Sequence, residues 1–349
     1  MTMDFTVSGP EVASALVDAA CPDVYFTSGY GRAAAVAEAG TWRMGHWQDH
    51  ILIPYVMRPI DGECVDAASP YGYAGIHMAS SCFPADLARF WSLALKRWRE
   101  LGMISLFLRF SPLDPDALAV VQRLATVELT RRGDTIAVWV DQGAGQVWDG
   151  MQGRSRTAVR KAWATGMDAT IRPAGPDDVA PGSPFRRRYE ETMTRLGSAP
   201  GYFFPDAYYR ELVDGLGKEL HIAEVRRPDG EVAAAALVLR HRDRAHYHLA
   251  GSEPESARQG ANNLLVWTIL EWAAESGCAT VHLGGGVRAD DGLFQFKRSF
   301  GGERTAFWTG TVIIDPGRYD LLVRRHAEAT GRTTGEISCS GFFPAYRAR

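Results

Sequence analysis

The most informative part of the sequence reads 220-LHIAEVRRPDGEVAAAALVLRHRDRAHYHLAGS-252, followed after eight residues by 261-ANNLLVWTILEWAAES-276. Its apolar runs predict three strands, at 220–226, 232–240 and 245–251. The turn Pro228-Asp229-Gly230 and the short second connection predict antiparallel hairpins. The second segment predicts an amphipathic helix over 261–276 that ends at Gly277, a typical C-terminal stop.

The alternation of helices and strands continues on both sides of this stretch. Downstream we expect a strand at 279–283 leading into Gly284-Gly285-Gly286, a strand at 305–314 and a helix at 318–330. Upstream we expect helices at 156–165, 186–196 and 205–216 and a strand at 168–172. The first half predicts helices at 11–20, 33–39, 84–101 and 116–123, and strands at 23–28, 50–60, 103–110, 125–130 and 135–140. The chain is therefore predicted to be α/β, of mixed type.

Length and composition favour two globular domains. The 349 residues are about twice the length of a common domain, and 46% are hydrophobic and 23% charged. This composition excludes a mostly disordered chain, a collagen-like fibre and a coiled coil. The stretch 141–153, rich in Gly and Gln, is the predicted boundary. The expected parts are an N-terminal domain at 1–150, a C-terminal domain at 151–330 and a tail at 331–349.

The sequence predicts a cytoplasmic location. No apolar run approaches the ~18–20 residues of a membrane span. The first residues, MTMDFTVSGPE, do not resemble a signal peptide. Five scattered cysteines without a CxxC indicate neither a zinc ribbon nor a disulfide framework, which fits a reducing compartment.

Charge is uneven along the chain. Residues 1–150 hold 11 basic and 17 acidic residues, a net charge of −6, whereas residues 151–349 hold 27 and 24, a net charge of +3. A positive stripe near the middle of the chain would suit phosphate, nucleotide or RNA. On charge alone, a solvated helix face explains it better.

Five stretches together resemble the FemABX branch of the GNAT acyltransferase superfamily, whose members have tandem GNAT-like domains. They are DVYFTSGYGRA (23–33), SPYGYAG (69–75), SRTAVRKAWATGMDATI (155–171), YHLAGS (247–252) and LFQFKRSFGG (293–302). Each motif is weak, and their order and spacing carry the resemblance. Three antiparallel strands, a long helix, a strand and a helix also follow the order of a GNAT core. The resemblance implies two tandem GNAT-like domains with mixed central sheets flanked by helices.

The resemblance also implies transfer of an acyl group to an amine. In the best-known branch the donor is an aminoacyl-tRNA and the acceptor a peptidoglycan precursor, and natural-product relatives use a small amine or hydroxylamine. We expect an aminoacyl-tRNA-dependent aminoacyltransferase that forms an amide or ester bond on such an acceptor. An acyl-CoA-dependent N-acyltransferase is the first alternative. A non-catalytic nucleotide- or peptide-binding protein on a GNAT scaffold is the second.

Lys297 and Tyr247 are the predicted catalytic residues. Lys297 matches the lysine of the family's L..FK..FG motif, which the resemblance associates with the donor phosphates and the reacting ester. A fixed cation aimed at the oxyanion of such a reaction is worth about 10²–10³ in rate. Without the motif, a solvated lysine beside a core phenylalanine would be the better interpretation. The donor 3′ end is expected near Tyr247, and Phe296 is expected to support the lysine.

The acceptor is expected in a cleft near the domain junction. Tyr71 and Tyr73 lie in a Gly-rich segment and can hydrogen-bond or stack on a nucleotide or acceptor, although a tight turn with aromatic plugs fits equally well. Asp66 could hold the acceptor amine or take its proton, although a surface aspartate is the commoner case.

Basic residues are predicted to meet the donor phosphates. On the helix at 156–165, Arg156 and Arg160 share one face and Lys161 borders it, with Arg154 just before. This arrangement suits a diphosphate or an RNA acceptor end. Arg195 and Ser252 are further expected substrate contacts.

Other kinds of site have little support. The segment SARQGANN (256–263) keeps only a remnant of the (Q/R)xxGx(G/A) loop that holds acetyl-CoA in GNAT domains. His246 and His248 are predicted on one face of a strand, without carboxylate or Cys at metal spacing. The absence of GxSxG favours direct attack by a bound amine over an acyl-enzyme. We therefore expect no metal, no cofactor beyond the donor co-substrate, no membrane span and no protein partner.

Overall fold

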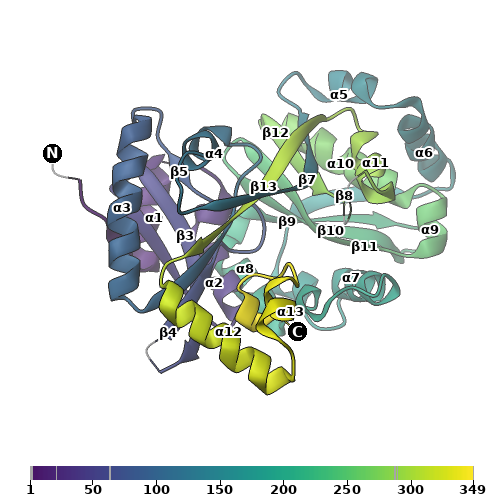
Figure 1. Cartoon of the computed structure of the whole chain (residues 1–349). Helices are drawn as coiled ribbons and strands as arrows, with labels where there is room; N and C mark the ends of the chain where they lie inside the picture. The colour runs from purple at the N-terminus through teal and green to yellow at the C-terminus, as the bar shows by residue number, and fades with distance from the viewer. Residues whose placement is uncertain (1–2, 21, 63, 287, 289, 349) are drawn as a thin grey trace. The chain divides into compact units, whose positions relative to one another are not determined.

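The computed structural model of the chain describes residues 3–20, 22–62, 64–286, 288 and 290–348 (Figure 1). The chain forms two compact units, one of residues 1–132 with 307–349 and one of residues 133–306. The two points where the chain passes between units lie inside the long strands β7 (Glu128–Trp139) and β13 (Glu303–Ile313). The predicted boundary at 141–153 therefore falls within the second unit, and the C-terminal residues belong with the first.

The second unit contains a mixed sheet in the order β7-β12-β11-β10-β9-β8. Its other strands are β8 (Asp168–Pro173), β9 (Leu220–Arg226), β10 (Val232–His241), β11 (Arg244–Ser252) and β12 (Thr280–Gly285). Its helices are α5 (Ala144–Gly150), α6 (Gly153–Ala164), α7 (Pro184–Arg195), α8 (Asp206–Leu216), α9 (Pro254–Arg258), α10 (Ala261–Glu275) and α11 (Gly292–Arg298). Helices α5, α6, α10 and α11 lie on one face of the sheet and α7 on the other (Figure 1).

The three predicted hairpin strands and the long helix are confirmed, each within one residue at either end. Ala234, Ala236 and Val238 on alternate positions of β10 form a common core with Leu265 and Ile269 of α10. All five side chains are fully buried, so this contact excludes water. Burial of each large aliphatic side chain contributes about 1.5–3 kcal/mol to folding.

A β-bulge in β11 decides which of its side chains face α10. The register against β10 passes from Leu249 to Tyr247 and leaves His248 without a partner strand residue. Directly opposite residues share a face, and Tyr247 is opposite the core residue Val238. Tyr247 therefore lies on the α10 face, whereas His248 is hydrogen-bonded to Tyr208 of α8.

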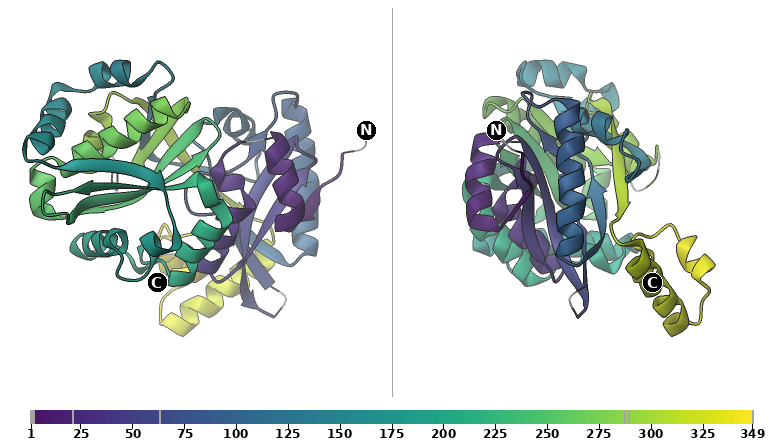
Figure 2. Two further views of the ribbon diagram at one scale, coloured as in Figure 1. Left: turned by 180° about the vertical axis from the view of Figure 1, so that it is seen from behind. Right: turned by 60° about the vertical axis from the view of Figure 1, so that its left-hand side comes forward.

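The first unit contains a sheet in the order β1-β2-β3-β4-β6-β13, with β5 paired to β3. Its strands other than β13 are β1 (Thr6–Ser8), β2 (Thr41–Trp47), β3 (Ile51–Asp61), β4 (Cys64–Ala68), β5 (His77–Met78) and β6 (Met103–Arg109). Its helices are α1 (Pro10–Ala20), α2 (Ser28–Ala37), α3 (Pro84–Glu100), α4 (Pro115–Val121), α12 (Pro316–Thr330) and α13 (Thr334–Ser338). Helix α3 covers one face of the sheet and α1 and α2 the other (Figure 2).

The two sheets repeat one plan. In each, a single parallel pair of strands, β4 with β6 and β11 with β12, interrupts an antiparallel arrangement. In each, the connection between the parallel strands contains a long helix, α3 or α10. The predicted α/β fold, with mixed central sheets flanked by helices, is confirmed.

Some predicted elements were wrong. The expected strand at 23–28 is a 3₁₀ turn, Val24–Phe26, followed by α2, because the Thr27 side chain accepts a hydrogen bond from the Tyr30 amide and caps the helix. The expected strands at 125–130 and 135–140 are the single strand β7, in which Gly133 has a φ of +145°. Among the described residues, no helix has both the length and the apolar character needed to cross a membrane.

Candidate functional site

The candidate site lies where β11 and β12 separate. The two strands pair in parallel over three positions, from Arg244 with Thr280 to His246 with His282. Beyond these pairs β11 continues to Ser252 and β12 to Gly285. Strands that part in this way leave backbone N–H and C=O groups that a bound substrate can engage.

Lys297 of α11 is buried at this opening, with 8% of its surface exposed. Its Nζ donates a hydrogen bond of 2.7 Å to the carbonyl oxygen of Gly285 and lies 5.9 Å from the ring centroid of Tyr247. Burial lowers the pKa of Lys297 to about 8, and the carboxylate of Asp291 opposes this shift. An ammonium group has three N–H donors, and Gly285 accepts from one of them, so within the described part of the chain two remain for a substrate.

Local sequence holds α11 against the end of β12. The Asp291 carboxylate accepts a hydrogen bond of 2.8 Å from the Phe294 amide and caps the helix, and Phe294 is buried in the core. A Cβ placed on Gly286 would lie 2.1 Å from an Asp291 oxygen. The glycine at position 286 thus lets α11 approach the end of β12. Helix α11 is too short for its periodicity to show in the sequence.

The Tyr247 ring lies beside the Lys297 ammonium on the α10 face of the sheet. Burial raises the pKa of its hydroxyl, which is therefore protonated at neutral pH. Its hydroxyl makes no hydrogen bond to another described residue, so it can donate one to a ligand. Phe296, expected to support the lysine, is half-buried and packs edge-on against Phe300, with ring centroids 5.2 Å apart.

The histidines of β11 and β12 belong to the opposite face. His246 and His282 have ring centroids 5.6 Å apart, and His282 shares a hydrogen bond of 2.8 Å with the Thr135 hydroxyl. Burial lowers the pKa of His248 to about 3, so this residue is neutral. No group of three or more metal-ligating side chains occurs among the residues that the structure describes.

The basic helix α6 runs from α11 to the start of α10. Arg154 donates a hydrogen bond of 3.1 Å to the Gln295 carbonyl of α11. Lys161 donates one of 3.0 Å to the Arg258 carbonyl at the end of α9. Both side chains are exposed. Their position beside the Lys297 helix is compatible with the predicted phosphate contacts.

Arg156 and Arg160, on another face of α6, differ in what they can still bind. The Arg156 guanidinium donates to the carbonyls of Trp148 and Asp149, at 3.2 and 2.9 Å, and to that of Met151. It therefore holds the C-terminal end of α5. Arg160 is exposed, with its guanidinium carbon 5.3 Å from the Trp148 ring centroid.

In the segment before α10, charged side chains pair with one another. Arg258 pairs with Glu255, so its guanidinium is engaged within the loop. Gly260, the N-cap of α10, has a φ of +100°, and a Cβ there would lie 2.2 Å from the Ala158 carbonyl of α6. The glycine permits close packing of α6 on the start of α10.

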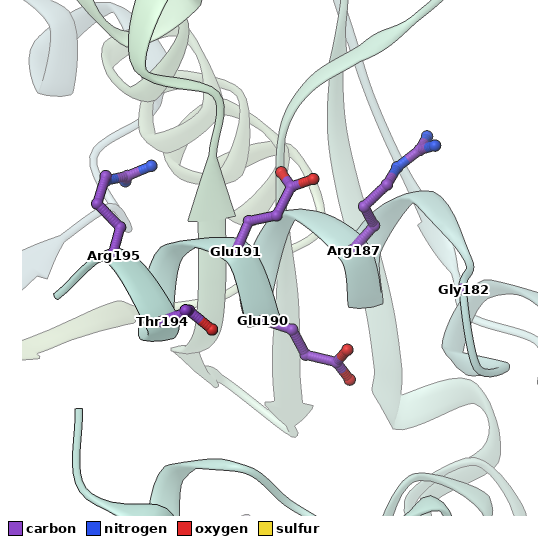
Figure 3. A pocket seen from close by; sticks show the side chains of 6 residues that line it. All are labelled: Gly182, Arg187, Glu190, Glu191, Thr194 and Arg195. Atoms are coloured by element: carbon purple, nitrogen blue, oxygen red, sulfur yellow. The ribbon is translucent and has the colours of Figure 1, made fainter. Parts of the chain in front are cut away.

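Arg195 and Ser252 join α7 to the end of β11. The Ser252 amide donates to the Thr192 hydroxyl at 3.1 Å, and Arg195 reaches the Ser252 carbonyl at 3.4 Å. Arg195 also lines an open hollow along α7, together with Gly182, Arg187, Glu190, Glu191 and Thr194 (Figure 3). The side chains of this hollow mix both charges, so they do not identify a ligand class.

Asp66, in the first unit, is fully buried and both of its oxygens are engaged. Arg58 Nε donates to one at 2.7 Å, and Arg347 Nε donates to the other at 2.6 Å. Arg58 also donates to Glu38 at 3.0 Å, and burial raises the pKa of Glu38 against the pull of Arg58. The contacts of Asp66 thus join the C-terminal segment to β3 and β4.

Tyr71 and Tyr73 are half-buried in an aromatic cluster of the first unit. The Tyr73 ring meets Tyr25 and Phe307 edge-on, at centroid separations of 6.0 and 5.1 Å. The Tyr71 ring lies 5.8 Å from the guanidinium carbon of Arg109. Both rings keep exposed surface, so each can pack in this cluster and also contact an acceptor.

Comparison with known protein families finds a match over the part of the chain that carries Lys297 and Tyr247. Residues 154–298 match the family described as the acetyltransferase (GNAT) domain, a range that includes α6, β11 and Lys297. No curated protein sequence matches the chain.

Solved structures share the fold of nearly the whole chain. FemX has a TM-score of 0.69 at 13% identity, covering 91% of this chain and 99% of FemX. L-PGS from Bacillus licheniformis has a TM-score of 0.58 at 12% identity, covering 86% and 91%. A tandem GNAT protein from the clavulanic acid biosynthesis pathway has a TM-score of 0.53 at 11% identity, covering 90% and 99%. The predicted FemABX-type tandem fold is therefore confirmed.

Proposed function

We propose that this chain, an acyltransferase with a GNAT domain at 154–298 and the fold of FemX, is an aminoacyl-tRNA-dependent aminoacyltransferase. Its acceptor would be an amine or hydroxyl of a small molecule or a peptidoglycan-type precursor. The observation that carries the proposal is the buried Lys297 ammonium, with N–H groups to spare, where β11 and β12 part. The order of the sequence motifs supports the aminoacyl group as the cargo.

The proposed reaction is direct attack on the ester of the donor. The acceptor nitrogen bonds to the ester carbonyl carbon, whose oxygen becomes an oxyanion that Lys297 stabilises through an N–H group. The carbon–oxygen bond to the ribose then breaks, and the proton lost by the amine ends on the ribose hydroxyl. With a pKa of about 8, Lys297 is mainly charged at neutral pH and can also pass a proton to the leaving oxygen.

Other residues take supporting roles in the proposal. Tyr247 donates its hydroxyl proton to the bound ester or ribose, and Phe296 keeps α11 in place. Arg154, Arg160 and Lys161 meet the donor phosphates. Tyr71 and Tyr73 contact the acceptor. Asp66 is a positioning residue, because its carboxylate is already shared by two arginines.

An acyl-CoA donor is the second candidate, and specific observations favour it. The matched family is described as an acetyltransferase (GNAT) domain. The similar tandem GNAT protein is described with reference to acetyl-CoA, which that structure lacks. The backbone amides in the first turn of α10 also suit the approach of a phosphate. The same Lys297 would then face a thioester.

A donor screen distinguishes the two candidates. Purified protein is incubated with radiolabelled aminoacyl-tRNAs or with acetyl-CoA, together with small amines and peptidoglycan precursors, with and without RNase. We expect an amide product that disappears with RNase. RNase-insensitive product with release of CoA would contradict the proposal and support the second candidate.

Replacing Lys297 tests the mechanism. We expect Lys297→Ala to lower kcat by about 10²-fold or more, because it removes the oxyanion donor. Lys218→Ala, at an exposed lysine of the same unit, is the matched control and should retain wild-type kcat. The wild-type kcat should also fall above about pH 8, where Lys297 loses its proton. Equal kcat in both variants, with folding intact, would remove Lys297 from the mechanism.

A further inference from the structure

Two stacked indoles stand out on the surface of the GNAT domain. Trp163 at the end of α6 and Trp148 of α5 are stacked, with ring centroids 5.8 Å apart and ring planes at 19°. The buried Trp267 of α10 meets the Trp148 ring edge-on at 4.7 Å. Trp163 is 47% exposed, so the stack is rigid on its inner side and open on its outer side.

The surroundings of this stack are positively charged. Helix α6 carries three arginines and one lysine and no acidic residue. Arg160 lies one helical turn before Trp163, with its guanidinium carbon 5.3 Å from the Trp148 ring centroid. Lys161, two residues before Trp163, is exposed on a different side of the helix. Acids close to the stack in sequence are Asp149, exposed at the end of α5, and Asp168, exposed at the start of β8, and Glu255 pairs with Arg258. An open aromatic face flanked by arginine is the pattern that binds single-stranded nucleic acid.

The stack is also joined to the catalytic region through α6. Arg154, at the start of the helix, contacts the Gln295 carbonyl two residues before Lys297. From Arg154 to Trp163 the helix rises by about 13 Å, at ~1.5 Å per residue. That length is comparable with a few nucleotides of single strand. Arg154 and Trp163 lie about half a turn apart around the helix, so a strand from Lys297 to Trp163 would cross the exposed side of α6, where Lys161 and Arg160 lie.

We infer that the Trp148–Trp163 stack, with Arg160 and Lys161, is a base-stacking platform for the single-stranded 3′ end of the donor RNA. A base upstream of the terminal adenosine stacks on the outer face of Trp163. Arg160, Lys161 and Arg154 neutralise the phosphates between that base and the ester. This inference rests on the proposed function and adds to it the element that recognises RNA.

The experiment measures binding of uncharged tRNA, intact or lacking its last three nucleotides, by fluorescence anisotropy. We expect Trp163→Ala to weaken binding of intact tRNA about 5- to 100-fold, as the loss of one stacking ring does. Trimming should weaken binding to the wild type, with little further effect on Trp163→Ala. Trp139→Ala, at an exposed tryptophan of β7, is the matched control and should bind like the wild type. Trp163→Phe, which keeps an aromatic face, should restore most of the affinity.

Several results would overturn the inference. These are wild-type binding by Trp163→Ala, equal effects of trimming on both proteins, or no tRNA binding by the wild type. Loss in Trp163→Ala of binding to coenzyme A or to anionic vesicles, with tRNA binding unchanged, would assign the stack to those ligands instead.

Turnover separates this inference from the proposed function. With the tRNA concentration varied, Trp163→Ala should raise the KM for tRNA and keep kcat at saturation. Lys297→Ala should lose kcat and still bind tRNA. If turnover is RNase-sensitive and Trp163→Ala has an unchanged KM for tRNA, the platform is refuted and the proposed reaction is still supported. Trp163-dependent tRNA binding without any aminoacyl transfer would refute the reaction and leave the platform standing.

Discussion

Lys297 shows at the residue scale how a functional group is kept at a cost to stability. Its ammonium is buried and donates a hydrogen bond to the backbone carbonyl of Gly285. Burial disfavours the charged form and lowers the pKa from 10.5 to about 8. A side chain with this environment is better suited to chemistry than to packing, which is the physical argument for the catalytic role that we propose for Lys297.

The stability of the wild type should therefore rise with pH between about 8 and 10.5. In this window the unfolded chain binds a proton at Lys297 that the folded chain has lost, so the free energy of unfolding increases with pH. Lys297→Met should remove this rise and be more stable at pH 7 by roughly 1–3 kcal/mol. Urea unfolding of both proteins at pH 7 and pH 10 checks this. A difference in stability that stays constant with pH would contradict it.

At the scale of elements, the start of α10 is packed directly against α6. Gly260 has a left-handed φ of +100°, and the Ala158 carbonyl occupies the space where a Cβ would be. The same two helices hold the buried tryptophan and the basic face of the proposed RNA platform. The close approach of the Ala158 carbonyl to the start of α10 thus requires a glycine at position 260.

We expect Gly260→Ala to destabilise the protein by about 2 kcal/mol or more, because backbone strain and a steric clash act together. Gly277→Ala is the matched control. Gly277 also has a positive φ, of +77°, but has open space around its Cβ position, so only the strain remains, about 1 kcal/mol. Thermal unfolding compares the two variants. Equal losses would show that α6 yields to the added methyl group.

At the scale of the whole chain, the first unit is built from both ends of the sequence. Residues 307–349 return to it through β13, α12 and the C-terminal segment. Arg347 then reaches the fully buried Asp66, and the Tyr346 hydroxyl is hydrogen-bonded to Ser105 at 2.9 Å. Ile337, Ala345 and Tyr346 of the predicted tail thus pack in a hydrophobic cluster of this unit.

Arg347→Ala should destabilise the protein by about 1–3 kcal/mol, because it removes a guanidinium that donates a hydrogen bond to a buried carboxylate. Arg325→Ala removes another arginine of the C-terminal region, whose pair with Asp61 is exposed on both sides. It should change the free energy of unfolding little. Denaturant titration measures both, and equal effects would argue against a buried role for the Asp66–Arg347 pair.

The sequence by itself determined the local elements whose pattern is long and regular. The strands of the 220–252 stretch, the helix after it and the L..FK..FG motif were legible because their signals lie within neighbouring residues. Only the tertiary structure decided which residues share a site. The bulge at His248, the short helix of Lys297, the pairing of Asp66 with Arg347 and the stack of Trp148 on Trp163 depend on register and on contacts between distant segments. Such contacts leave no periodic trace along the chain, because the packing of the folded molecule, and not local propensity, determines them.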